Sequence, residues 1–227
     1  MRGETLYIGF DEAGHASDNI LKGEVVVAFY SLDANDASPL PFRRNRKSRD
    51  AQAHLIMAQN NYFFTTIPAD KSKQREANLV LVAPLLLDKC ISEVQLTGAR
   101  ISQFGVYFDG ANYDFCAEAL YEDMSANFPS MPCIAIQHFK KNNNRRNLRL
   151  NAFVKCPRVV YCADQRAHVL YSASHELEGY DKYIPLPEGY IERRIFELEK
   201  IARGAFTQSN PQSSKERLFY RKPFPSH

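Results

Sequence analysis

The stretch LYIGFDEAGH, Leu6–His15, joins an apolar run to two adjacent acids and a histidine. Its residues alternate with the two-residue period of a β-strand. The more apolar set is Leu6, Ile8 and Phe10, and the other set is Tyr7, Gly9 and Asp11. Asp11 therefore ends the less apolar face of a strand, where acids are often ordinary turn residues. Whether Asp11 and Glu12 are turn residues or part of a chemical site depends on what the chain places beside them.

The remaining segments predict an α/β fold. β-branched and aromatic runs predict strands, and apolar residues at helical spacing predict helices. We expect strands at 5–11, 23–32, 60–67, 104–110, 132–139 and 158–162. We expect helices at 46–59, 69–97, 112–128, 163–177 and 188–203, with Pro84 bending or dividing the second and Gly204 stopping the last.

Composition and length favour one globular domain with a tail. The 227 residues are 44% hydrophobic and 24% charged, and no apolar run is long enough to span a bilayer. We expect a single domain over 1–204 and a polar, flexible tail over 205–227, in which Leu218, Phe219, Tyr220 and Phe224 offer a surface for a protein partner. Strand-like sequence begins by Leu6, so a signal peptide is not expected and the predicted location is cytoplasmic.

Five scattered cysteines and six histidines show no zinc or redox spacing, and buried free thiols are the expected reading. Two short basic runs stand out because net charge is only +3. They contain Arg43, Arg44, Arg46, Lys47 and Arg49 in the first and Lys140, Lys141, Arg145, Arg146 and Arg149 in the second. Such runs suit a polyanion such as nucleic acid, whereas either run alone is more simply a solvated loop.

Acids follow two strands at matching points. Asp109 ends the less apolar face of the strand at 104–110, as Asp11 does in the first. If the two strands are parallel neighbours, these acids leave the sheet at one edge, where a divalent cation would offset their repulsion. Asp164 lies in the first turn of the expected helix at 163–177, with His168 one turn later on the same side. Oxygen ligands without cysteine favour Mg²⁺ or Mn²⁺, although each acid alone is also explained as a turn residue or as an acid favoured by the helix dipole.

FDEAGH resembles the opening of type 2 ribonucleases H, and VVVAF resembles their second strand. RKSRDAQAHLI and VYFDG resemble their Ser-Lys-Lys segment and the strand ending in their next catalytic aspartate. VVYCADQRAHVLYS is closer to an uncharacterised ribonuclease-H-like family that begins Asp-Glu-Ser-Gly. The resemblance spans 6–172 and implies a ribonuclease-H-like mixed sheet, three antiparallel strands followed by parallel strands, flanked by helices. It also implies that Asp11, Glu12, Asp109 and Asp164 are the catalytic, metal-binding acids.

Two departures from type 2 enzymes affect what is expected. Gly-His15-Ala replaces the Gly-Arg-Gly with which they recognise a ribonucleotide, and Asn142, Asn143 and Asn144 stand where their last acid is expected. Asp164 would then supply the missing ligand. His15 and His168 are candidates for proton transfer near the metals, or are simply surface histidines. Lys47 is a candidate phosphate contact, and we expect Tyr7 and Tyr107 to pack in the sheet rather than to hold a sugar.

The leading hypothesis is a Mg²⁺- or Mn²⁺-dependent nuclease that hydrolyses phosphodiester bonds in RNA, DNA or a hybrid. Two ions about 4 Å apart would activate water and stabilise the leaving oxygen. A second hypothesis is a nucleic-acid-binding or assembly protein that kept the fold and lost activity. A third is another phosphoryl-transfer activity, such as that of a transposase or an exonuclease.

Overall fold

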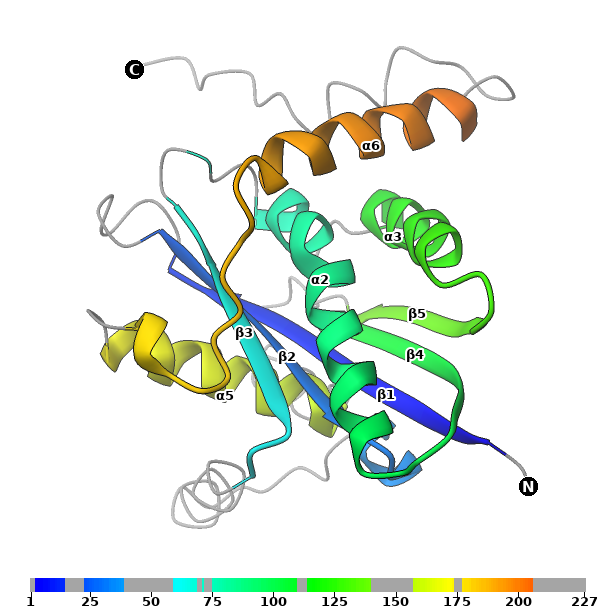
Figure 1. Ribbon diagram of the computed structural model, residues 1–227, viewed down its shortest axis with the longest axis vertical. Coiled ribbons are helices and arrows are strands. Elements are labelled where there is room, and N and C mark those ends of the chain that lie inside the picture. Colours follow the sequence, from blue (N-terminus) through cyan, green and yellow to red (C-terminus); the bar gives the residue numbers. More distant parts are fainter. Residues whose placement is uncertain are drawn as a thin grey trace, which may run out of the picture.

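A computed structural model describes residues 3–14, 23–38, 59–68, 71, 75–109, 114–139, 157–173 and 177–205. It contains one five-stranded sheet with the order β3-β2-β1-β4-β5 (Figure 1). The strands are β1 Glu4–Ala13, β2 Glu24–Ser31, β3 Tyr62–Ile67, β4 Ile101–Asp109 and β5 Cys133–Phe139. β1 to β3 are antiparallel, while β4 runs parallel to both β1 and β5. The predicted α/β class, with a sheet of antiparallel and parallel strands flanked by helices, is confirmed.

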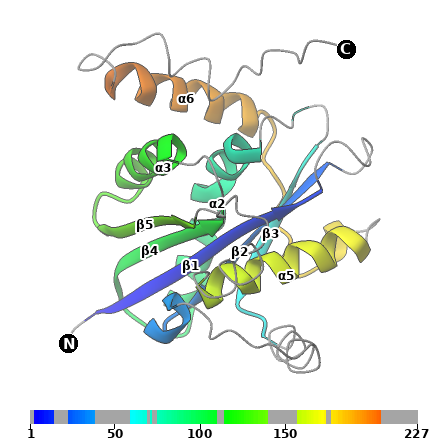
Figure 2. The ribbon, with the colours of Figure 1, turned by 180° about the vertical axis from the view of Figure 1, so that it is seen from behind.

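Three long helices lie on one face of this sheet. They are α2 Arg75–Leu96 and α3 Asp114–Asn127, which lie over the sheet, and α6 Tyr190–Ala205, which packs on α2 and α3. Among the described α-helices, α5 Arg158–Ala173 is the one on the other face (Figures 1 and 2). The larger core cluster joins α2 to the even-numbered residues of β1, such as Ile8 and Phe10. The smaller cluster joins α5 to odd-numbered strand residues, including Val27 and Phe29. This alternation is the strand periodicity expected from the sequence.

α2 is one continuous helix through Pro84, so the expected helix is not divided there. Pro84 and Leu86 are buried, and Leu79 to Ala83 form its most buried stretch. α6 contains Gly204 and runs to Ala205, the last described residue, so Gly204 does not stop the helix as predicted. One glycine costs a helix only about 1 kcal/mol, which does not by itself end it.

α5 begins earlier than predicted. The segment 158–162, expected as a strand, is the first part of α5, and its first helical hydrogen bond runs from the backbone N–H of Tyr161 to the carbonyl of Pro157 over 3.1 Å. β-branched residues favour strands, but Val159 and Val160 are fully buried here as helical residues against the sheet. Asp164 is consequently in the second turn of α5 rather than the first. The helix dipole favours acids in the first turn, so it no longer explains why an acid stands at this position.

Gly9 explains how closely α5 approaches β1. A Cβ atom at Gly9 would overlap the backbone of Val159 and Val160. Further along the strand, Gly14 has φ +103° and a Cβ there would overlap the ring of Tyr171. The helix therefore contacts β1 at two points without intervening side chains from the strand.

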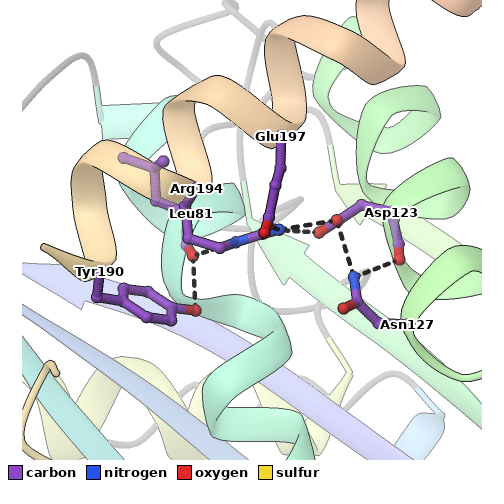
Figure 3. Close-up of polar contacts among 6 residues, drawn as sticks. All are labelled: Leu81, Asp123, Asn127, Tyr190, Arg194 and Glu197. Atoms are coloured by element: carbon purple, nitrogen blue, oxygen red, sulfur yellow. Dashed lines mark hydrogen bonds and ion pairs between the residues drawn. The ribbon is translucent and has the colours of Figure 1, made fainter.

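α6 is fastened to both neighbouring helices by a buried polar cluster (Figure 3). Arg194 Nη1 and Nη2 donate to the two carboxylate oxygens of Asp123 in α3 over 3.1 and 2.5 Å, and Nη1 also donates to Glu197 Oε2 over 2.7 Å. Arg194 Nε and the Tyr190 hydroxyl both donate to the carbonyl of Leu81 in α2. Burial raises the pKa of the Asp123 carboxyl, and the Arg194 guanidinium opposes that rise.

Several sequence predictions lie outside the described residues. The first basic run and most of the helix expected at 46–59 fall within 39–58, and the second basic run falls within 140–156. The expected tail lies outside them from residue 206 onward.

Candidate functional site

The parallel pairing of β1 with β4 ends at Phe10 and Phe108, while β1 itself continues to Ala13. Their parallel pairing is in register from Leu6 opposite Phe104 to Phe10 opposite Phe108. Asp11 and Asp109 are the next residues of the two strands. The parallel neighbourhood on which the predicted site depends is therefore present in the backbone, while the side chain of Asp109 lies outside the described part.

The Asp11 carboxylate is buried and held at the strand end. Asp11 is 4% exposed, and its Oδ1 accepts a hydrogen bond from the backbone N–H of Glu12 over 2.8 Å. This bond forms one residue beyond the last pair of β1 with β4. A carboxylate oxygen thus satisfies a backbone donor at the point where the parallel ladder has ended.

α5 brings Asp164 to the level of Asp11. The five residue-to-residue steps from Gly9 to Gly14 span about 17 Å in a strand, and the eleven steps from Val160 to Tyr171 span about the same length in a helix. Because both ends are in contact, the helix runs alongside β1 in the same direction (Figure 2). Asp11 lies about 7 Å beyond Gly9, and Asp164 about 6 Å beyond Val160.

Asp164 also lies on the side of α5 that faces β1 and β4. Tyr171, seven residues after Asp164 and so on the same side of the helix, contacts Gly14, the residue that follows β1. On the opposite side, the Arg166 guanidinium lies 4.4 Å from the ring centroid of Tyr62 in β3, and its Nη2 donates to the Gln59 carbonyl over 2.8 Å. Burial lowers the pKa of Arg166 from its usual range.

Two neighbours on α5 contact the Asp164 carboxylate. His168 Nε2 is 3.3 Å from Oδ1, and Gln165 Nε2 donates to Oδ2 over 2.9 Å. The Asp164 side chain is 35% exposed and that of His168 is 67% exposed. The predicted proximity of Asp164 and His168 is confirmed, and the pair stands at the solvent-facing rim of the site.

Glu12 belongs to the other face of the sheet. β1 keeps its alternation to Ala13, which packs in the cluster on the α5 face, so Glu12 shares the α2 face with Phe10. Glu24 of β2 lies on that face too and accepts a hydrogen bond from Asn78 of α2. The strand thus separates Asp11 from Glu12, which the resemblance had placed in one ligand set.

Tyr7 and Tyr107 pack beside the acids on the α5 face. Their ring centroids are 6.5 Å apart, and Tyr107 is 6% exposed. Burial raises the pKa of the Tyr107 phenol, and Tyr7 and then Cys133 contribute less to the rise. These contacts agree with the predicted packing role of both tyrosines.

The described donors of the site suit a hard cation. Asp11 and Asp164 supply carboxylate oxygens, the ligand type that Mg²⁺ and Mn²⁺ prefer. Among the described side chains, no three acids, histidines or cysteines form a group able to hold a metal ion. His15 and all of the predicted nucleic-acid-binding Lys and Arg residues lie outside the described residues.

Sequence reasoning missed Tyr161 and Tyr171 as neighbours of this site. They stand three residues before and seven after Asp164, on the same side of α5. The helical spacing was available in the sequence, but the expected start of the helix at Ala163 excluded Tyr161 from it.

No protein-family model matches the chain, and no curated protein matches it. None of the helices in the described ranges is long and apolar enough to cross a membrane.

Proposed function

We propose that the chain is a ribonuclease-H-like, divalent-metal-dependent nuclease that hydrolyses phosphodiester bonds in RNA, DNA or a hybrid. The observation that supports this most strongly is the backbone arrangement of three acid positions. Asp11 and Asp109 follow the last parallel pair of β1 and β4, and α5 lies against β1 with Asp164 at the level of Asp11. The strand order, with three antiparallel strands followed by two parallel ones, supports the proposed architecture.

Three of the four acids predicted from the sequence are metal ligands in this proposal. Asp11, Asp109 and Asp164 would hold Mg²⁺ or Mn²⁺, and the cation would supply an activated water and a stabilised leaving oxygen. Glu12 is left out of this set because strand alternation assigns it to the α2 face. The buried position of Asp11 excludes bulk water from one side of the site.

The basic runs would bind the nucleic-acid backbone. β5 ends at Phe139, which pairs with Asp109, and Lys140 is the next residue of the chain. The second basic run therefore directly follows β5 in the sequence. Its lysine and arginine side chains would attract a phosphate backbone and offset its repulsion by the carboxylates.

The test is cleavage of labelled single-stranded RNA, single-stranded DNA and RNA/DNA hybrid in Mg²⁺, Mn²⁺ or EDTA. Asp11→Asn, Asp109→Asn and Asp164→Asn each keep the side-chain size and remove one ligand charge. We expect metal-dependent cleavage that each variant lowers by more than about 100-fold, because outer-shell partners of metal ligands alone are worth about 10- to 100-fold.

Asp88→Asn is the matched control, because Asp88 is an exposed acid in α2 on the opposite face of the sheet. It should retain wild-type cleavage. Melting temperatures identify any variant that loses activity through unfolding. Failure of the wild type to cleave any of these substrates would refute the nuclease, and cleavage unaffected by Asp164→Asn would refute the assignment of that residue.

A further inference from the structure

The edge of the sheet that β3 forms is covered by a segment from much later in the chain. β3 is the outermost strand, next to β2. The segment 177–184 leads from α5 to α6 and passes along the outer side of β3 (Figure 1). It begins with the short 3-10 helix η2 Leu177–Gly179. We call residues 177–184 the edge strap.

Within the described ranges, the edge strap bonds to the backbone of β3 at Phe64 alone. Phe64 N–H donates to the Lys182 carbonyl over 3.1 Å, and Ile184 N–H donates to the Phe64 carbonyl over 2.8 Å. The two bonds form one parallel bridge. Both backbone groups of Phe64 therefore point away from β2, and alternation along the strand turns those of Tyr62 and Thr66 the same way.

Two tyrosine rings hold the edge strap over the same residue. The ring centroids of Tyr180 and Tyr183 lie 6.1 and 5.5 Å from that of Phe64. The Tyr183 hydroxyl lies 3.2 Å from Thr66 Oγ1, which adds a side-chain hydrogen bond at the next outward position of β3. The strap is thus centred on the middle of the strand.

A lysine places a charge of the edge strap beside this strand. Lys182 Nζ donates to Glu93 Oε1 of α2 over 3.0 Å and lies 4.8 Å from the centroid of the Phe63 ring. Lysine at the margin of a sheet is a common means of preventing two edges from pairing. The strap therefore covers the edge with backbone and with charge.

β3 itself has the composition of a strand that pairs with other chains. Its sequence, YFFTTI, is made of aromatic and β-branched residues, with no charge, proline or glycine. Short segments of this kind associate edge to edge when their outer backbone groups are uncovered. In antiparallel pairing of two β3 strands about Phe64, Tyr62 of each copy stands opposite Thr66 of the other. The strand is therefore complementary to itself under a twofold axis.

We infer that the edge strap is a cap, and that its displacement lets β3 pair antiparallel with β3 of a second copy of this chain. While the strap is in place it occupies the outward groups of Phe64, so a second strand cannot pass along the edge. Displacement exchanges one bridge for a ladder along the whole strand. The inference is independent of the proposed nuclease, because β2 separates β3 from β1.

Analytical ultracentrifugation over a range of protein concentrations tests the cap. The double variant Tyr180→Ser with Tyr183→Ser removes both rings from Phe64 and changes no residue of the sheet. We expect its mass to rise with concentration toward twice that of the wild type, which should keep one mass. Tyr121→Ser is the matched control, since Tyr121 is a 46% exposed tyrosine in α3, and it should behave like the wild type.

Adding Thr66→Pro to the double variant identifies the surface that associates. Proline removes the outward N–H of Thr66 and leaves the pairing with β2 intact, which is where an edge strand accepts it. This triple variant should keep one mass at all concentrations. Circular dichroism and melting temperatures establish that each variant is folded. If the double variant is unfolded, Lys182→Ala replaces it, because that change removes only the contacts with Glu93 and Phe63.

Three results would overturn the inference. The first is a folded strap variant, double or Lys182→Ala, that keeps one mass at every concentration. The second is association that Thr66→Pro does not prevent, because it would use another surface. The third is a wild type that associates and is made monomeric by Thr66→Pro, since its edge would then be open with the strap intact.

Discussion

At the scale of single residues, Gly9 decides whether α5 can lie on β1. Its position has no room for a Cβ atom, because the backbone of Val159 and Val160 occupies that space. Backbone cannot move as a flexible side chain does, so the strand or the helix would have to shift. The position of Asp164 beside Asp11 depends on this close approach of α5 to β1. Gly9 therefore controls the geometry of the proposed site, although it has no functional side chain.

Gly9→Ala should lower the free energy of unfolding by about 1–3 kcal/mol, the usual cost of forcing extra volume into a packed region. Gly179→Ala is the control, because nothing lies within 4 Å of a Cβ atom there and its φ is not positive. Urea denaturation of both variants measures the difference. Equal stability of Gly9→Ala and the wild type would show that α5 does not approach the strand so closely.

At the scale of elements, α6 is attached by charge as well as by apolar burial. Arg194 is 5% exposed and Asp123 is 1% exposed, and the side chain of Glu197 is 53% exposed. Arg194 therefore has two carboxylate partners, one buried and one at the surface. Asp123 has one cationic partner among the described residues, with Asn127 donating a further hydrogen bond over 3.0 Å.

This asymmetry predicts unequal effects of breaking the pair. Arg194→Met leaves the buried Asp123 carboxylate without a described cationic partner, so it should cost about 3–5 kcal/mol of unfolding free energy. Asp123→Asn should cost less, because Glu197 still contacts Arg194. Arg193→Met, at an exposed neighbouring arginine, is the control and should change little. Denaturant titrations in which Asp123→Asn costs more than Arg194→Met would contradict this account of α6.

At the scale of the whole molecule, the net charge is small, but positive charge is concentrated in two short segments. Net charge is +3, yet ten of the 29 Lys and Arg residues lie in the two basic runs. A polyanion would therefore be attracted locally and not by the overall charge. The second run directly follows β5 in the sequence, and β5 pairs with β4 up to Asp109.

Replacing Arg145, Arg146 and Arg149 together by Ala should weaken nucleic-acid binding and flatten its salt dependence. Each lost phosphate contact should reduce the slope of log K against log salt by about 0.9 on duplex DNA and about 0.7 on single strands. The corresponding triple variant of Arg43, Arg44 and Arg46 tests the first run. Titrations at several salt concentrations measure both, and unchanged slopes would reduce the runs to solvated loops.

The sequence alone predicted the five strands of the sheet and their two faces, because alternation of apolar residues has a direct physical cause in the pleat. It also placed Asp11 and Asp109 at matching positions, each directly after the last residue of its strand that pairs with the other. Only the tertiary structure decided where α5 begins, since the strand propensity of Val159 and Val160 was outweighed by their burial in a helix against the sheet. It likewise separated Asp11 from Glu12, because β1 continues its alternation to Ala13 instead of ending at the acids. Asp11 and Glu12 are neighbours in the sequence but belong to opposite faces of the sheet. Asp11 and Asp164 are 153 positions apart in the sequence, and they reach the same level along β1 because α5 packs on Gly9.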